Sequence, residues 1–239
     1  MANVHERRFE LRGAPRSVRG FMPVAPDRIR VLPHVVFDTG IEHDGPIPVQ
    51  TVPRGAHTEM RVVLPAMTRP GEYRGTLQIG DDRFAVLALV EASTHLTCIP
   101  PRIELVYGAN RRLRETLTLV NDGNVPAEIA KHYGFGLFES SGLDRAIRNA
   151  FEARDVADRS IVEAFSNAAA DEYGGLVAAS VAEGAGPLEP GAMRSIALSF
   201  RLTEKARRGA SYFGYLSIEN LAIPVLVRNA DHAAKEAAS

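Results

Sequence analysis

The chain has 239 residues, of which 45% are hydrophobic and 24% charged, and it contains 20 glycines and 15 prolines. This composition suits a globular protein with one large or two small cores, and it excludes disorder, collagen and a disulfide-stapled scaffold. Twenty-eight basic and 29 acidic residues give a formal net charge of -1, so no global charge draws the chain to nucleic acid or an anionic membrane.

The N-terminal segment MANVHERRFELRG carries charges where a secretory signal would carry its apolar segment. No stretch approaches the roughly 18 uninterrupted apolar residues of a membrane helix, so we expect a cytoplasmic protein without membrane insertion. Five arginines crowd this end of the chain: Arg7, Arg8, Arg12, Arg16 and Arg19. Such a cluster suits an acidic partner or a nucleic-acid backbone, but stacking aromatic residues are sparse there and arginine is common throughout the chain. We therefore expect no nucleic-acid binding.

An apolar run that ends in Asp38-Thr39-Gly40 has the pattern of an aspartic protease. In that chemistry two aspartates share one proton and activate a water molecule. This chain has one copy of the pattern, so such an enzyme would be a homodimer, and Ile41 stands where those proteases usually carry Ser or Ala. The same residue types routinely close a strand at a turn. We favour the turn, with a homodimeric aspartic-type hydrolase using Asp38 as the alternative function.

Other candidate sites are weaker. His34, Asp38, His43 and Asp44 are of types that suit a divalent cation, but their spacing matches no familiar ligand pattern. The single cysteine, Cys98, cannot form an internal disulfide and has no adjacent base, so we expect a buried, inert thiol in a reducing compartment. Phosphate-binding and nucleophile-elbow motifs are absent. We expect no enzyme activity, no metal and no cofactor.

The chain contains an internal repeat, because residues 71–91 and 210–228 match at a constant offset of 139. The matched pairs are Tyr73 with Tyr212, Gly75 with Gly214, Leu77 with Leu216, Ile79 with Ile218, Phe84 with Ile223 and Val86 with Val225. Each segment alternates apolar and other residues, breaks at a polar turn and alternates again. Each is therefore predicted to form a β-hairpin.

Further strands are expected upstream of each hairpin. Their alternating apolar residues are Met60, Val62 and Leu64 in the first half and Ile196, Leu198, Phe200 and Leu202 in the second. Segments 28–31 and 102–105 match one another, and Thr116–Asn121 is a strand closed by the turn Asp122-Gly123-Asn124. Many short strands without crossover helices predict an antiparallel β-sandwich in each half.

Two sets of residues carry a family resemblance. Tyr73 in GEYRG and Tyr212 in ASYFG are similar to the tyrosine corner of immunoglobulin-like domains. Residues 117–127, LTLVNDGNVPA, resemble bacterial immunoglobulin-like modules of the NEW3 and CARDB type. The resemblance implies two tandem immunoglobulin-like sandwiches, and modules of this kind are adaptors, spacers, binding domains and chaperones. Pilus chaperones share the two-domain architecture, but they are exported.

Residues 140–173 interrupt the second half with helix-forming sequence. Leu143, Ala146, Ile147, Ala150 and Phe151 fall on one face of a first helix. A second helix is predicted from Ser160, which has capping-box spacing to Glu163, and Gly174-Gly175 are expected to end the helical segment. Two interpretations of the insertion are compatible with each other: it covers a face of its own sandwich, and part of it presents apolar side chains to another protein.

The expected organisation is an all-β protein of two tandem immunoglobulin-like antiparallel sandwiches, residues 1–94 and 95–229, with the helical insertion at 141–173 and a disordered tail at 230–239. The expected function is non-enzymatic protein–protein interaction or assembly, as a bacterial adaptor or structural module. The predicted partner-binding residues are Leu143, Ile147 and Phe151, and the expected partner is another protein.

Overall fold

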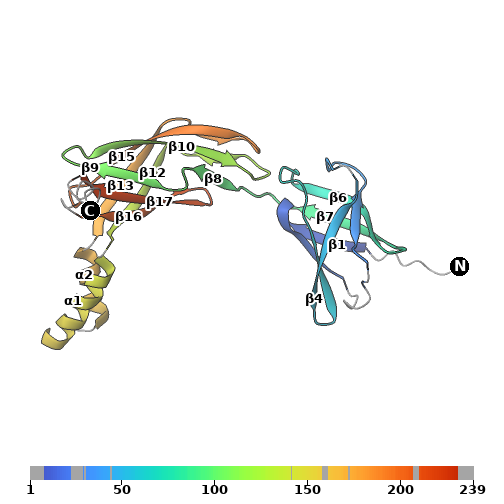
Figure 1. Cartoon of the computed structure of the whole chain (residues 1–239), viewed down its shortest axis with the longest axis horizontal. Helices are drawn as coiled ribbons and strands as arrows, with labels where there is room; N and C mark the ends of the chain where they lie inside the picture. Colours follow the sequence, from blue (N-terminus) through green and yellow to red (C-terminus); the bar gives the residue numbers. More distant parts are fainter. Residues whose placement is uncertain are drawn as a thin grey trace, which may run out of the picture. The chain divides into compact units, whose positions relative to one another are not determined.

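The computed structural model describes residues 8–22, 29, 31–43, 45–140, 142–157, 161–171, 173–206 and 210–230. The chain is predominantly β and forms two compact units (Figure 1). Unit 1 runs up to His95 and includes Asn121–Ala127 and Glu189–Gly191. Unit 2 comprises Leu96–Val120, Glu128–Leu188 and the residues from Ala192 onward.

Unit 1 is a closed seven-stranded barrel in the order β1-β2-β5-β4-β3-β6-β7. Its elements are β1 (Arg8–Gly13), a short 3-10 helix (Pro15–Ser17), β2 (Val18–Met22), β3 (His34–Phe37), β4 (Ile47–Arg54), β5 (His57–Val62), β6 (Gly71–Ile79) and β7 (Asp82–Val90). Alternate residues of these strands point inward, so Val18, Met22, Met60 and Leu77 are almost completely buried. The sequence predicts an antiparallel sandwich for this unit; its strands are β as expected, and the parallel pairing of β1 with β7 closes the sheet into a barrel.

Unit 2 contains an eight-stranded sheet in the order β8-β10-β15-β13-β12-β16-β17-β9 and a small two-stranded sheet of β11 and β14. Its strands are β8 (Leu96–Ile99), β9 (Ile103–Tyr107), β10 (Arg112–Asn121), β11 (Ala127–Ile129), β12 (His132–Glu139), β13 (Tyr173–Glu183), β14 (Gly186–Leu188), β15 (Met193–Arg201), β16 (Tyr212–Ile218) and β17 (Leu221–Asn229). Tyr107, Leu119, Phe200 and Leu216 are among its buried core residues.

The repeated hairpins are confirmed, since β6 pairs with β7 and β16 with β17, both antiparallel. Ile79 pairs with Asp82 and Ile218 with Leu221, which leaves a two-residue turn in each. The first turn residues, Gly80 and Glu219, have φ of 61° and 51°. Positive φ at this position suits the twist of two-residue hairpins, so the repeat extends to the backbone of the turn.

The strand that pairs with the last hairpin strand of each unit differs from the prediction. Phe9 of β1 pairs in parallel with Val86, and Ile103 of β9 pairs in parallel with Val225, the repeat partner of Val86. The strand equivalent to β9 is therefore β1 and not residues 28–31, of which Arg28 and Arg30 lie outside the described residues. Neither unit is purely antiparallel, because β1 and β9 satisfy the backbone groups along the open edge of the final hairpin strand.

Two helices, α1 (Gly142–Ala157) and α2 (Ile161–Asp171), connect β12 to β13 in unit 2. Figure 1 shows them side by side, projecting away from the end of the sheet. The predicted two-helix insertion is thus present, although Ser160 lies outside the described residues. Gly174 and Gly175 do not end the helices but belong to β13, where Gly175 has a φ of 95° that favours glycine.

Candidate functional site

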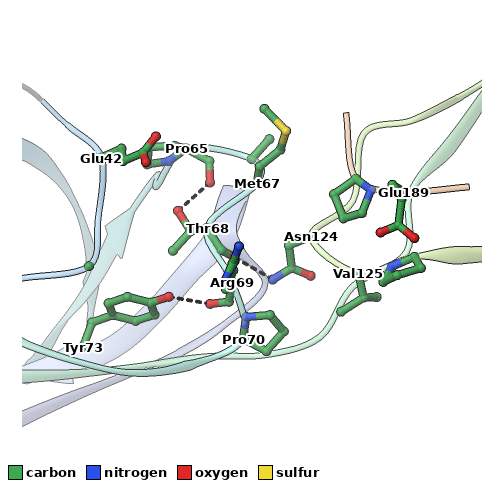
Figure 2. A pocket seen from close by; sticks show the side chains of 14 residues that line it. Glu42, Pro65, Met67, Thr68, Arg69, Pro70, Tyr73, Asn124, Val125 and Glu189 are labelled. Atoms are coloured by element: carbon green, nitrogen blue, oxygen red, sulfur yellow. Dashed lines mark hydrogen bonds between the residues drawn. The ribbon is translucent and has the colours of Figure 1, made fainter. Parts of the chain in front are cut away.

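The loop between β5 and β6, Pro65–Pro70, borders a pocket in unit 1 (Figure 2). Its other lining residues are Gly40, Glu42, Tyr73, Asn124, Val125, Pro126, Glu189 and Pro190. All of them belong to unit 1. The pocket can bind a polar ligand only if the polar side chains that line it direct hydrogen-bond donors and acceptors into it.

Tyr73 forms a tyrosine corner. Its phenol oxygen donates to the backbone oxygen of Arg69 at 2.7 Å, four residues upstream (Figure 2). The Thr68 hydroxyl donates to the Pro65 oxygen at 2.7 Å in the same loop. For Tyr212, which is 1% exposed, the equivalent carbonyl at position 208 lies outside the described residues, so the second corner stays a prediction.

Asn124 fixes the same loop from the opposite side. Its amide nitrogen donates to the Thr68 oxygen at 2.9 Å and to the Glu91 oxygen at 3.0 Å, and its amide oxygen accepts from the Ser93 N–H at 2.7 Å. Gly123 is required beside it, because a Cβ there would lie 2.3 Å from the Ser93 oxygen. The polar groups of Thr68, Tyr73 and Asn124 thus form hydrogen bonds to the backbone and are not directed toward a ligand. The Asn-Asp-Gly-Asn phrase has a structural role that sequence reasoning missed.

The catalytic alternative gains no support from the geometry around Asp38. Asp38 is exposed and directly follows β3, and its backbone N–H donates to the Arg74 oxygen at 2.9 Å. Gly40 has a φ of 84°, as a tight turn requires. This arrangement supports the strand-closing turn.

The remaining sequence candidates are dispersed or partly buried. Asp44 of the metal-type group lies outside the described residues, and the described part of the chain holds no group of three or more His, Cys, Asp or Glu that could bind a metal ion. Cys98, on β8, is only partly buried, and its burial raises the pKa of the thiol. A raised pKa disfavours the reactive thiolate.

The predicted apolar face of α1 divides into two parts. Ala146 and Ala150 are buried, whereas Ile147 and Phe151 are 41% and 53% exposed; the side chain of Leu143 lies outside the described residues. α1 and α2 pack against each other, and Ile147 and Phe151 remain exposed to solvent. Ile147 and Phe151 are thus not covered by the sheet of unit 2.

The root of α1 is fixed to β12. Arg145 donates through Nη2 to Glu139 Oε1 at 2.7 Å, and the Glu139 carboxylate is largely buried. The backbone N–H of Ser140 donates to the Ser211 oxygen at 2.9 Å. These bonds define the direction in which α1 leaves the sheet.

An exposed aromatic patch lies on the outer face of β12, β13 and β16, where the helices begin and end. It consists of Phe138, Tyr173, Leu176, Phe213 and Tyr215. The Phe138 ring centroid is 5.5 Å from that of Tyr173 and 6.1 Å from that of Phe213. Tyr173 lies over Gly136, whose missing side chain makes room for the ring.

The aromatic patch was missed because its residues alternate with buried ones. In β16, Tyr212, Gly214 and Leu216 face the core, so Phe213 and Tyr215 face outward. In β12, a register shift between Leu137 and Phe138 adds one residue to β13 and keeps Phe138 opposite Tyr173. The sequence did carry one signal: in YFGY, aromatic residues stand at positions that face the core and also at positions that face solvent.

Comparison with known proteins identifies no family: no protein-family model matches the chain, and no curated protein matches it. Structures that align with it include a two-domain titin fragment, with 9% identity, 95% of this chain and 97% of the other covered, and a TM-score of 0.30. The titin Z1Z2 domains in complex with telethonin align at 9% identity, with 93% and 92% covered and a TM-score of 0.25. An endo-fucoidan hydrolase of glycoside hydrolase family 107 aligns at 10% identity, with 96% of this chain and 29% of the other covered, and a TM-score of 0.25. Similarity at this level carries no argument about function. Among the described residues, no helix is both long and apolar enough to span a bilayer.

Proposed function

We propose that this protein is a non-enzymatic interaction or assembly module whose unit 2 binds another protein. The observation that carries the proposal is the aromatic patch, exposed at the root of two helices that project from the sheet. Phe138 of β12 is 51% exposed and Tyr215 of β16 is 57% exposed. Contiguous exposed apolar surface of this kind marks interaction sites on soluble proteins.

The second contact surface is the exposed stripe of α1. Ile147 and Phe151 are four residues apart and therefore lie one above the other on the helix. Aromatic side chains are enriched at the centres of interfaces, where each buried anchor contributes about 2 kcal/mol of binding free energy. Leu143, the third residue predicted from the sequence, belongs to the same proposal.

The partner that fits these surfaces is a protein with an apolar row of its own. The aromatic patch has a rigid strand scaffold, so little conformational entropy is lost when its rings are covered. The tyrosine corner at Tyr73 supports an immunoglobulin-like fold for unit 1. The proposal includes tandem immunoglobulin-like domains at 1–94 and 95–229 that act in a bacterial cytoplasmic assembly.

Site-specific photocrosslinking in the native host tests the proposal. A benzophenone amino acid is placed at Phe151, at Phe213 or at the control position Met193, which is 74% exposed in the same unit. We expect one protein to crosslink from both Phe151 and Phe213 and not from Met193. That protein is then purified and titrated against wild type and Ile147→Ser, and the variant is expected to bind about 30-fold more weakly. Equal crosslinking from Met193, or unchanged affinity of the variant, would overturn the proposal.

A further inference from the structure

Glu59 lies on the outer face of the unit 1 barrel beneath three arginines from three strands. Arg61 Nε is 2.7 Å from Glu59 Oε1, Arg54 Nε is 3.0 Å from Oε2, and Arg19 Nη1 is 4.0 Å from Oε1. The Glu59 side chain is only 6% exposed, whereas those of Arg19 and Arg54 are more than half exposed. A single buried carboxylate therefore holds three guanidinium groups within one small area.

The bonding pattern leaves donors available at the surface. Arg54 and Arg61 bond Glu59 through Nε, and Arg19 directs its own Nε to Ser17 Oγ at 2.7 Å. A guanidinium group has five N–H donors in a fixed fork, so bonding through Nε leaves the terminal Nη groups for an oxyanion. Glu59 and Ser17 thus orient the three guanidinium groups without occupying their terminal Nη donors.

The cluster carries more positive than negative charge. Three arginines and one glutamate sum to +2, and hydrogen bonds from Arg61 and then Arg54 lower the pKa of Glu59 to about 2, so the carboxylate is ionised at neutral pH. Arg19 also stands directly opposite Arg61 in the β2–β5 ladder, where like charges repel. Two unbalanced charges held together in this way favour a dianion.

An exposed aromatic ring stands beside the cluster. Phe21, which is 65% exposed, pairs directly with Glu59 in the β2–β5 ladder and therefore lies on the same face. The ring offers a planar apolar surface next to the arginine forks. Its position favours an anion attached to an aromatic or similarly flat group.

We propose that Arg19, Arg54 and Arg61 form a binding site for a dianionic phosphate monoester, with Phe21 contacting the group that the phosphate esterifies. A phosphate monoester carries up to two negative charges and three acceptor oxygens, which match the charge excess and the three arginine forks. This site belongs to unit 1 and is independent of the interaction proposed for unit 2.

Calorimetric titration at pH 8 tests the site with three probes: phenyl phosphate, inorganic phosphate and phenyl sulfate. Phenyl phosphate is expected to bind tightest, because inorganic phosphate lacks the ring and phenyl sulfate has one negative charge. Arg54→Gln and Arg19→Gln are each expected to weaken phenyl phosphate binding about tenfold. Phe21→Ala should reduce the affinity for phenyl phosphate to that for inorganic phosphate.

The matched control is Arg83→Gln, an exposed arginine of the β6–β7 hairpin in the same unit, which should leave the affinity unchanged. Circular dichroism spectra and cooperative unfolding like those of the wild type show that the barrel is intact in the Arg19 and Arg54 variants, although Arg54→Gln should melt at a lower temperature because Glu59 loses a hydrogen-bond partner. Absence of phenyl phosphate binding, equal binding of phenyl sulfate, or equal weakening by Arg83→Gln would overturn the proposal.

Discussion

Replacing Asn124 tests whether the Asn-Asp-Gly-Asn turn is a structural clamp of unit 1. Asn124→Ala removes two donated bonds and one accepted bond, all to backbone, from a side chain that is 4% exposed overall. Each such bond contributes about 0.5 to 1.5 kcal/mol net, and the Glu91 carbonyl can rebind water because Glu91 is exposed. We therefore expect the free energy of unfolding of unit 1 to fall by about 2 to 3 kcal/mol.

Asn124→Asp keeps the side-chain volume but removes the two donated hydrogen bonds, so it separates the effect of hydrogen bonding on stability from the effect of lost volume. The new carboxylate still accepts from Ser93 but faces the Thr68 and Glu91 oxygens, so its pKa should be raised in the folded state. The loss of stability should then be greatest at neutral pH and should shrink as the pH falls and the carboxyl group protonates. Chemical denaturation followed by circular dichroism gives the free energies, and hydrogen exchange at the Ser93 amide reports the local bond. Wild-type stability and unchanged Ser93 protection in Asn124→Ala would refute the reasoning.

Three further predictions concern other groups. Tyr73→Phe should lower the free energy of unfolding by about 1 kcal/mol, because the exposed Arg69 carbonyl regains water, and the buried Tyr212→Phe should cost about 1 to 3 kcal/mol; thermal melts of both variants check this. The pKa of Glu59 is lowered to about 2, so the ionised carboxylate stabilises the fold above about pH 4.5, and this effect is lost toward pH 2. In acid denaturation, the difference in free energy of unfolding between wild type and Glu59→Gln should disappear over that pH range. Burial raises the pKa of the Cys98 thiol, so a disulfide reagent at pH 8 should react with the folded protein more slowly than with the unfolded chain, and equal rates would contradict this.

The sequence predicted the two final hairpins well, because their residues alternate with strict period two and repeat at one offset. It failed for β1 and β9, since parallel pairing of distant strands leaves no local pattern. It also failed to show that unit 1 closes into a barrel, which depends on the β1–β7 pairing. Local periodicity thus identifies hairpins, whereas long-range pairing decides the architecture.

For the helical insertion, too, the sequence predicted the local structure but not the packing. The spacing of Ala146, Ile147, Ala150 and Phe151 correctly predicted one helix, but period alone cannot tell which residues of a stripe are covered. In the structure the two alanines are buried, whereas the larger Ile147 and Phe151 stay exposed. The YFGY segment of β16 carried a signal for outward-facing aromatic residues, but the patch as a whole arises from three strands that the chain brings together from residues 138, 173–176 and 213–215.

The most direct test of the interaction account is to replace residues 141–171 with a short Gly-Ser linker and measure the affinity for the crosslinked partner. The helices pack mainly on one another, so the sheet of unit 2 should keep its circular dichroism spectrum and cooperative unfolding. Because the three proposed α1 anchors, Leu143, Ile147 and Phe151, are lost and each contributes about 2 kcal/mol, binding should weaken at least about 100-fold. A folded variant with wild-type affinity would contradict the account, and collapse of unit 2 would show that the helices are structural instead.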